Sequence, residues 1–198
     1  PPFDPYSPRD VAKGPVTDDN KVVTLPKRGE AEDENPFAEA DALAPVDSSL
    51  NASLREVMTK DPTFRPKEFL NGARMAYEMI VMGFADGDRN TLKNLLSKEV
   101  FEGFEAAISE RESRGEVVKS TFVGIEKADI TQAGIRDSEV QITLRIVSQL
   151  ISATYDKDGK LVDGDPDAVA EVDDIWTFSR DMRSRDPNWK LIATESEQ

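Results

Sequence analysis

The sequence PKEFLNGARMAYEMIVMGFADG, residues 66–87, decides the fold of this chain. Its apolar residues recur at steps of three and four positions, which predicts a long helix with one broad buried face. The residues on that face are Phe69, Leu70, Ala73, Tyr77, Ile80, Val81 and Phe84. Pro66 suits the first position of a helix, and Gly87 suits its C-terminal end. Because a further side carries Met75, Met79 and Met82, we expect the helix to be covered from more than one direction.

A shorter helix is predicted just before this one. Asp47 or Ser48 caps it, and the Asp61-Pro62 pair ends it. Its apolar stripe has the spacing i, i+4, i+7, i+8 and consists of Leu50, Leu54, Val57 and Met58. Its polar face offers only Arg55 and Lys60 as cations, whereas helices that lie on membranes usually carry more. We therefore favour packing on the core, with a membrane-surface or partner-seeking helix as the alternative.

Two further helices are predicted between the long helix and the strands. The first carries Leu92, Leu95 and Leu96. Ser97 suits the N-cap of the second helix, and Gly115 suits its end. The inward stripe of this second helix consists of Val100, Phe101, Phe104, Ala107 and Ile108. A stripe with two phenylalanines is more typical of a core than of a ligand site.

Beyond Gly115 the hydrophobic period changes from about 3.6 residues to two, which predicts β-strands. The first strand covers Val117 to Ile130. The next three alternate at Val140, Ile142, Leu144 and Ile146, at Val172, Asp174, Trp176 and Phe178, and at Trp189, Leu191 and Ala193. Ile151 and Tyr155 are out of phase with the second strand, which predicts a bulge or a bend there. Three to four helices followed by four antiparallel strands predict an α+β fold.

The charge balance and the missing residue types exclude several classes of function. The formal net charge is −14, which argues against broad nucleic-acid binding. The chain has no histidine and no cysteine, so it lacks the residues of Ser-His-Asp and Cys-His catalysis and of the usual zinc sites. We therefore expect no enzyme, no metal site and no cofactor. The loop over residues 156–165 is rich in aspartate and glycine, and it suits a hairpin better than a calcium site.

The sequence divides into a tail and one domain. Residues 1–45 are predicted to be a disordered, acidic, proline-rich tail or linker, and residues 46–198 the folded domain. The tail suits a flexible tether, which is compatible with a second role as a docking peptide. No run approaches the roughly 20 apolar residues that span a bilayer. Because the sequence opens at Pro1 rather than at a methionine, we expect it to be a fragment or a processed product, which leaves room for a membrane segment upstream of it.

Candidate site residues come from two sets of side chains. Six of them suit a groove for a partner or an apolar ligand, although each taken singly suits the core better: Tyr77, Met79, Met82, Phe101, Trp176 and Trp189. Three arginines suit either a cationic patch for anions or a solvated loop: Arg180, Arg183 and Arg185. An enzymatic role would depend on an acid such as Asp174 projecting into a pocket.

Three blocks of the sequence resemble, in order, the Tim-forty-four-like domain family, the C-terminal part of a mitochondrial inner-membrane import translocase subunit. The blocks are FLNGARMAYEMI with FADGD, at residues 69–80 and 84–88, LLS with VFEGF, at 95–97 and 100–104, and WTFSR with DPNWKL, at 176–180 and 186–191. The opening PPFDP, residues 1–5, is similar to bacterial members of the TimA type, in which a membrane helix precedes it.

The resemblance implies a cone-shaped domain like nuclear transport factor two, with three to four helices packed on a bent four-stranded antiparallel sheet and no catalysis. It implies an adaptor for protein transport or membrane-protein assembly, whose partners are translocase, chaperone or membrane proteins. The implied place is the cytoplasmic, matrix-equivalent face of the inner membrane, where an N-terminal segment tethers the domain. The alternative is a cone-fold domain that binds a small apolar ligand or acts on it.

The chain departs from the family in two places that limit these implications. The segment at residues 35–60 is acidic, whereas membrane-touching helices of the family are typically basic, so lipid binding by the domain is not carried over. The long basic N-terminal portion of the mitochondrial subunit has no counterpart in the tail at residues 1–45. Recruitment of the import motor is therefore not carried over either.

Overall fold

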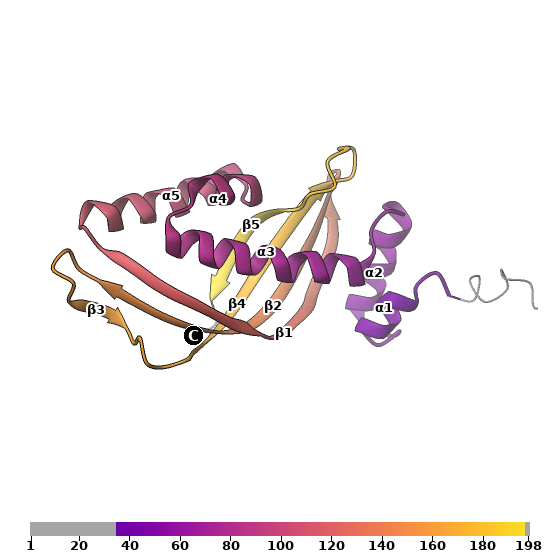
Figure 1. Cartoon of the computed structure of the whole chain (residues 1–198). Helices are drawn as coiled ribbons and strands as arrows, with labels where there is room; N and C mark the ends of the chain where they lie inside the picture. Colours follow the sequence, from indigo (N-terminus) through magenta and orange to yellow (C-terminus); the bar gives the residue numbers. More distant parts are fainter. Residues whose placement is uncertain (1–34, 197–198) are drawn as a thin grey trace, which may run out of the picture. The chain divides into compact units, whose positions relative to one another are not determined.

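The computed structural model describes residues 35–196, and the part of the predicted tail at residues 1–34 lies outside this range. Within it, the helices are α1 (Ala38–Leu43), α2 (Ser49–Lys60), α3 (Pro66–Asp86), α4 (Arg89–Leu95) and α5 (Lys98–Ser113). The strands are β1 (Val117–Arg136), β2 (Glu139–Tyr155), β3 (Leu161–Gly164), β4 (Ala170–Asp181) and β5 (Lys190–Ser196) (Figure 1). Helices packed on an antiparallel sheet confirm the α+β class, with five helices instead of three to four and a short fifth strand.

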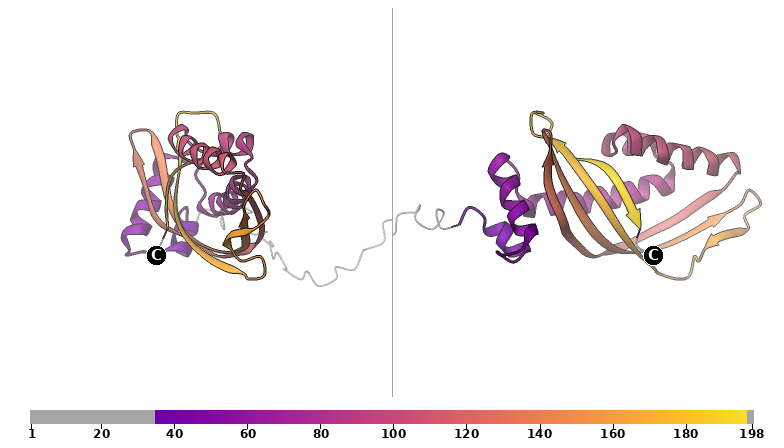
Figure 2. Two further views of the ribbon diagram at one scale, coloured as in Figure 1. Left: turned by 90° about the vertical axis from the view of Figure 1, so that its left-hand side faces the viewer. Right: turned by 180° about the vertical axis from the view of Figure 1, so that it is seen from behind.

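Helix α3 is the central element, and the bent sheet curves around it (Figure 2). Gly87 ends α3 with a φ of 69°, a left-handed conformation that favours glycine. The face predicted to be buried contains Phe69, Ala73, Tyr77 and Ile80, and all four are buried. The sheet covers this face, and Leu92 of α4 contacts the helix at Gly83. The flank with Met75 and Met79 is exposed, contrary to the expectation that the methionine side is covered.

Helix α1 lies inside the segment that was predicted to be a disordered tail. Its anchor is Asn51 of α2, whose buried side-chain amide donates hydrogen bonds to Asp41 Oδ1 (2.9 Å) and to the Ala44 carbonyl (3.0 Å). Arg55 also donates to Asp41 Oδ1 at 2.8 Å. The prolines that suggested disorder flank the helix instead of interrupting it, because Pro36 precedes it and Pro45 follows it.

Helix α2 confirms its prediction, and α5 confirms it in part. The hydroxyls of Ser48 and Ser97 accept hydrogen bonds from backbone N–H groups of the first turns, so both predicted caps are present. Along the predicted stripe of α5, however, Ile108 is fully buried whereas Ala107 is exposed. Helix α5 therefore packs on the core less deeply than its sequence pattern indicates.

An ion-pair network and a helix-end contact compensate for the shallow packing of α5. Arg89 of α4 donates to Glu105 Oε2 (2.7 Å) and to Glu112 Oε2 (2.9 Å), which joins α4 to α5. Arg111 of α5 donates to the Phe84 carbonyl (2.9 Å) at the end of α3. A cation there also interacts favourably with the helix dipole.

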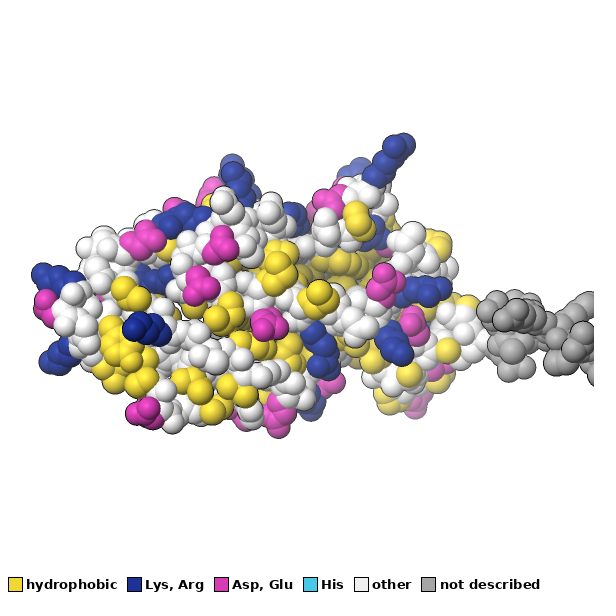
Figure 3. All heavy atoms as spheres, in the orientation of Figure 1, with side chains coloured by type: hydrophobic (Ala, Val, Ile, Leu, Met, Phe, Trp, Pro, Cys, Tyr) yellow, Lys and Arg dark blue, Asp and Glu magenta, His cyan; other side chains and the backbone are white. Residues whose placement is uncertain are grey.

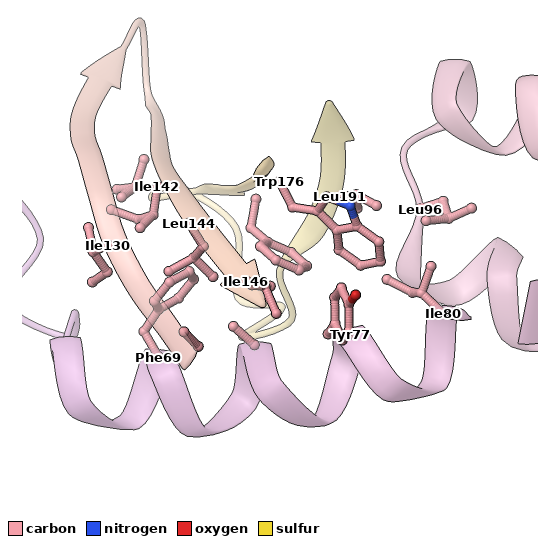
Figure 4. Packing of buried hydrophobic residues seen from close by; sticks show 14 of the residues in the cluster. Phe69, Tyr77, Ile80, Leu96, Ile130, Ile142, Leu144, Ile146, Trp176 and Leu191 are labelled. Atoms are coloured by element: carbon pink, nitrogen blue, oxygen red, sulfur yellow. The ribbon is translucent and has the colours of Figure 1, made fainter. Parts of the chain in front are cut away.

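The sheet is antiparallel with the order β1-β2-β4-β5, and β3 pairs with the distal part of β2. The predicted alternation along β2 is confirmed, because its four inward side chains are fully buried: Val140, Ile142, Leu144 and Ile146. They meet α3 in the core, where Trp176 and Leu191 complete the contact from β4 and β5 (Figure 4).

The predicted irregularity of β2 is produced by extra residues on its neighbour β1. The register between the two strands shifts three times, and the unpaired residues on β1 are Val123, Glu126 and Thr131. A similar shift places an extra residue, Ile192, in β5 opposite the step from Thr177 to Phe178. This bulge turns Ala193 outward, so the prediction that it continues the inward set of Leu191 is wrong.

The aspartate-rich loop forms the turn between β2 and β3, as the hairpin interpretation predicts. Asp156 Oδ1 accepts hydrogen bonds from the backbone N–H groups of Asp158 and Lys160, both at 2.9 Å. This carboxylate is therefore engaged in the turn itself.

Gly164 is the position in this hairpin that requires glycine, and it gives a test of the fold. Its φ is 79°, and a Cβ atom there would lie 2.2 Å from the Ser152 carbonyl oxygen. We expect Gly164→Ala to destabilise the β2–β3 hairpin by about 1–3 kcal/mol. Amide hydrogen exchange, measured strand by strand, should show faster exchange in β3 and in the paired residues of β2.

Gly103→Ala is the matched control for that substitution. Gly103 lies in α5, and a Cβ atom there would meet nothing within 4 Å. Alanine favours a helix interior over glycine by roughly 0.5–1 kcal/mol, so this variant should unfold at higher urea concentration than the native chain. Equal behaviour of the two variants would contradict the assignment of strain to Gly164.

Candidate binding groove

Two of the predicted groove residues lie in the core. Tyr77 is fully buried, and its ring centroid is 4.5 Å from that of Trp176, which is also buried. The two aromatic rings face each other from α3 and β4 (Figure 4). They bind the central helix to the sheet and are closed to a partner.

Tyr77 also belongs to a buried polar network. Its hydroxyl donates to Asp174 Oδ2 at 2.8 Å and lies 2.7 Å from the hydroxyl of Ser148. Burial raises the pKa of the Asp174 carboxyl, and burial likewise raises the pKa of Tyr77. The network joins α3, β2 and β4. Asp174 does not line the groove described next.

An apolar groove of about 530 Å³ lies beside the exposed flank of α3. Its walls come from the α2–α3 loop, α3, α4, β4 and the β4–β5 loop. The apolar lining residues are Phe64, Phe69, Ala73, Met75, Ala76, Met79, Leu95, Phe178, Pro187 and Trp189. Figure 3 shows apolar side chains gathered between α3 and the β4–β5 loop on this face. The polar lining residues are Thr63, Arg65, Glu68, Asn94, Arg180 and Asn188.

The spacing of residues along α3 creates the groove. The core face of the helix carries Phe69 and Ala73, and the flank one position away carries small residues at Gly72 and Ala76. Small side chains there leave room above the helix backbone. Met75 and Met79 extend the same flank with flexible apolar side chains, 68% and 48% exposed.

A buried ion pair holds the end wall of the groove. Arg180 of β4 pairs with Asp61 of the α2–α3 loop, and their side chains are only 12% and 6% exposed. Arg180 also donates to Thr63 Oγ1 at 2.9 Å, and Thr63 in turn donates to Asp61 Oδ1 at 2.6 Å. The pair thus fixes the α2–α3 loop, which carries Phe64, to the C-terminal end of β4.

The aromatic wall stands directly against this ion pair. The Arg180 guanidinium lies 5.7 Å from the centroid of the Trp189 ring. The Trp189 ring makes edge-to-face contacts with Phe69, at 4.7 Å between centroids, and with Phe64, at 5.9 Å. Such pairs contribute about 0.5–1.5 kcal/mol each beyond the burial of area. The indole is therefore held in one orientation at the edge of the groove.

The chemistry of the groove suits binding of an apolar group. Two of its charged lining residues, Arg65 and Glu68, are exposed, whereas Arg180 is neutralised by Asp61. The Thr63 hydroxyl of the lining donates to Asp61 Oδ1, and this carboxylate is already engaged in the ion pair with Arg180. Among residues 35–196, no group of three or more acidic side chains is placed to hold a metal ion.

The predicted groove set is divided by the structure. Met79 and Trp189 line the groove, whereas Tyr77 and Trp176 lie in the core. Phe101 and Met82 are half-buried and lie outside the groove lining. Periodicity places the methionine flank correctly on another side of α3, but it does not show which loops stand opposite.

The three arginines do not form one patch. Arg180 is buried against Asp61, whereas Arg183 is 77% exposed and pairs with Asp181 at 3.3 Å. Arg185 is exposed in the β4–β5 loop. Their positions explain the separation. Arg180 lies on the inward-facing side of β4 and is covered there, whereas Arg183 and Arg185 lie in the solvated loop beyond the strand. The solvated-loop interpretation fits Arg183 and Arg185, and neither interpretation fits Arg180.

One groove residue, Gly72, carries a signal of the site in the sequence. Gly72 interrupts a strong helical pattern, and a Cβ atom there would meet nothing within 4 Å, so packing does not require glycine at this position. An interior glycine that costs helix stability without a packing reason indicates a surface where another group approaches closely. Phe64 and Leu95 have no comparable signal.

The described helices also bear on membrane attachment. Among residues 35–196, no helix combines the length and the apolar character needed to cross a bilayer.

The fold and the groove together define a class, an α+β domain with an apolar groove beside its central helix. Its sequence matches the Tim44-like domain over residues 50–196. The chain belongs to this family, which confirms the resemblance seen in the three sequence blocks.

Curated relatives are similar to the chain at low identity. The rat mitochondrial import inner membrane translocase subunit TIM44 is 22% identical over 157 residues, which cover 76% of this chain and 35% of that protein. The human subunit of the same name is 21% identical over the same length and coverage. An uncharacterized protein of Rickettsia prowazekii (strain Madrid E) is 24% identical over 153 residues, 76% of this chain and 63% of that one. The chain spans about a third of the TIM44 subunits.

Among solved structures, the intermembrane space region of the chloroplast protein ARC6 is similar to this chain with a TM-score of 0.47 and 12% identity. The match covers 68% of this chain and 98% of that structure.

The Asp61–Arg180 pair gives a prediction for stability. Arg180→Met leaves the buried Asp61 carboxylate without its countercharge, which should lower the free energy of unfolding by about 3 kcal/mol. The double variant with Asp61→Asn should recover part of that loss. Arg183→Met is the control, because the exposed Arg183 pair should contribute less than about 0.5 kcal/mol. Urea unfolding of the variants measures these differences, and equal losses in both single variants would contradict the assignment.

The Asp174 carboxyl gives a prediction for pH dependence. Because its pKa is raised in the folded state, the native chain binds this proton more tightly than the unfolded chain. The stability it contributes is complete below the unfolded pKa, near about 3.9, and is lost as the pH rises through the folded pKa. We expect the free energy of unfolding of Asp174→Asn to rise relative to the native chain between about pH 4 and neutrality. Urea titrations at several pH values test this, with Asp158→Asn in the exposed turn as control.

Proposed function

We propose that this chain is a non-enzymatic adaptor domain whose groove binds an apolar segment of a protein partner. The observation that carries the proposal is the groove itself, an apolar hollow of about 530 Å³ with an aromatic end wall and a flexible methionine flank. This volume falls in the range of about 300–1,000 Å³ that is typical of binding sites. The net charge of −14 argues against nucleic acid as the partner.

The composition of the groove supports a polypeptide occupant. Two or three apolar side chains of an amphipathic helix or an extended segment would fill it, as in other grooves that bind helices. Methionine is adaptable, so Met75 and Met79 would suit partners of varied shape. Arg65 and Glu68 stand at the exposed border, where they would pair with charged residues beside the apolar anchor.

The family supports a role in protein transport. The curated relatives are named as subunits of a mitochondrial inner membrane import translocase, and the matched part of them is the domain described here. We propose that the domain works at the cytoplasmic, matrix-equivalent face of an inner membrane. In this proposal a segment upstream of Pro1 anchors the domain, the chain before α1 links the two, and the partners of the domain are translocase, chaperone or membrane proteins.

A second candidate is a pocket for a small apolar molecule, since the size and lining of the groove also suit one. An enzymatic form of this candidate has less support. Asp174, the acid with a raised pKa, lies in the Tyr77 network and does not line the groove. Native mass spectrometry that found a retained small molecule would favour this second candidate.

Site-specific photo-crosslinking in cells that express the full-length protein tests the adaptor role. A photoreactive phenylalanine derivative replaces Met79 in the groove, and in the control it replaces Glu102 on the exposed side of α5. Discrete protein adducts identified as membrane, translocase or chaperone proteins are expected at position 79 and not at position 102. Because the substitution site is exposed in both variants, folding should be retained in both.

Filling the groove is the complementary test. In Gly72→Leu the new side chain enters the space above α3, while the helix gains propensity, so the fold should remain stable. We expect the crosslinks at position 79 to fall at least about tenfold in this background. Undiminished adducts in a folded Gly72→Leu protein would contradict the groove as the binding site.

A further inference from the structure

The sulfur atoms of this protein are distributed unevenly over its surface. The chain has no cysteine and five methionines. Met75 and Met79 are 68% and 48% exposed, and they are the most exposed of the five. Half-buried positions hold Met58, Met82 and Met182. The chain therefore offers oxidants no thiol, and its two accessible thioethers stand side by side.

Both accessible thioethers lie in the groove. Met75 and Met79 are four residues apart on α3, which places them on the same flank one turn apart, and both belong to the groove lining. Their side chains project away from the core face that carries Phe69, Tyr77 and Ile80. A chemical change at these two sulfurs alters the groove and leaves the packing of the helix on the sheet intact.

We infer that Met75 and Met79 form an oxidation-sensitive site that controls the apolar groove. The oxidant is hydrogen peroxide. A lone pair of the thioether sulfur attacks one peroxide oxygen, the O–O bond breaks, and an S=O bond forms. The remaining hydroxide takes up the proton of the transferred oxygen and leaves as water. The sulfur loses two electrons and the peroxide gains them, so the step needs no further reactant.

Oxidation changes what the groove can bind. A sulfoxide is polar and a strong hydrogen-bond acceptor, whereas the surrounding wall offers mainly the apolar surfaces of Ala76, Leu95 and Trp189. An apolar occupant would cover the sulfoxide oxygen and would offer it no hydrogen-bond donor of its own. Burial of an unpaired polar group of this kind weakens binding by about ten- to a hundredfold. The product is reversible, because methionine sulfoxide reductases restore the thioether.

The experiment uses the folded protein, hydrogen peroxide and the neutral apolar dye N-phenyl-1-naphthylamine. Peptide mass spectrometry follows oxidation at each methionine, and energy transfer from tryptophan follows dye binding at the groove edge. We expect Met75 and Met79 to be oxidised before the other three, and the dye affinity to fall at least about tenfold in step. Treatment with both methionine sulfoxide reductases, one for each epimer of the sulfoxide, should restore the dye affinity.

Paired variants distinguish the effect of oxidation at Met75 and Met79 from general oxidative damage to the protein. Met75→Leu with Met79→Leu keeps the volume and the helix propensity, so the dye affinity that this variant shows before peroxide treatment should be the same after it. Met58→Leu with Met182→Leu is the matched control and should stay sensitive. Equal oxidation of all five methionines, or unchanged dye affinity after oxidation of Met75 and Met79, would overturn the inference.

The biological role of this oxidation site rests on the proposed function, because a change in the polarity of the groove has an effect only if a partner binds there. The crosslinking test and the dye test can fail independently of each other. Absent crosslinks at position 79 would count against the adaptor role, while the dye measurements address the oxidation site alone. Peroxide treatment of the crosslinking strain then joins them. The photoreactive residue already replaces Met79 in this strain, so Met75 is the remaining oxidation site in the groove, and we expect peroxide to reduce the adducts in this strain and not after Met75→Leu is added.

Discussion

The structure depends on the burial of one face of α3 in a bent antiparallel sheet. Phe69, Tyr77 and Ile80 meet the inward residues of β2 and β4, and removal of this apolar area from water contributes about 1.5–3 kcal/mol for each large side chain. Because the sheet uses that face completely, the neighbouring flank is left open to solvent. The loops before α3 and after β4 close on this flank only partly, so the groove follows from how the core is built.

Periodicity predicted the core elements because their burial is one-sided. The steps of three and four along α3 and the alternation along β2 each identify a face, and both faces lie in the core. Local chemistry predicted the ends, since Ser48, Ser97 and Gly87 cap helices through interactions within a few residues. Elements held by distant polar contacts were missed. Helix α1 depends on Asn51 and Arg55 of α2, and no pattern within α1 shows them.

The candidate site was predicted only in part because it is made by tertiary contacts. Met79 and Trp189 looked suitable for a groove for the same reason as Tyr77 and Trp176, namely their side-chain type. Which of them face each other in the core depends on the curvature of the sheet. The residue pattern of a single sequence does not reveal this curvature. Likewise, Arg180 resembled its neighbour Arg183 until the fold placed Asp61 beside it.

The three bulges of β1 have a consequence for the edge of the sheet. A long edge strand normally presents a regular row of unpaired N–H and C=O groups, which templates aggregation with any extended polypeptide. In β1 the extra residues Val123, Glu126 and Thr131 interrupt that row, and Lys119 and Lys127 add charge along it. Extended polypeptides are thereby discouraged from adding to the sheet as a further strand, which protects the domain from amyloid-like growth at this edge.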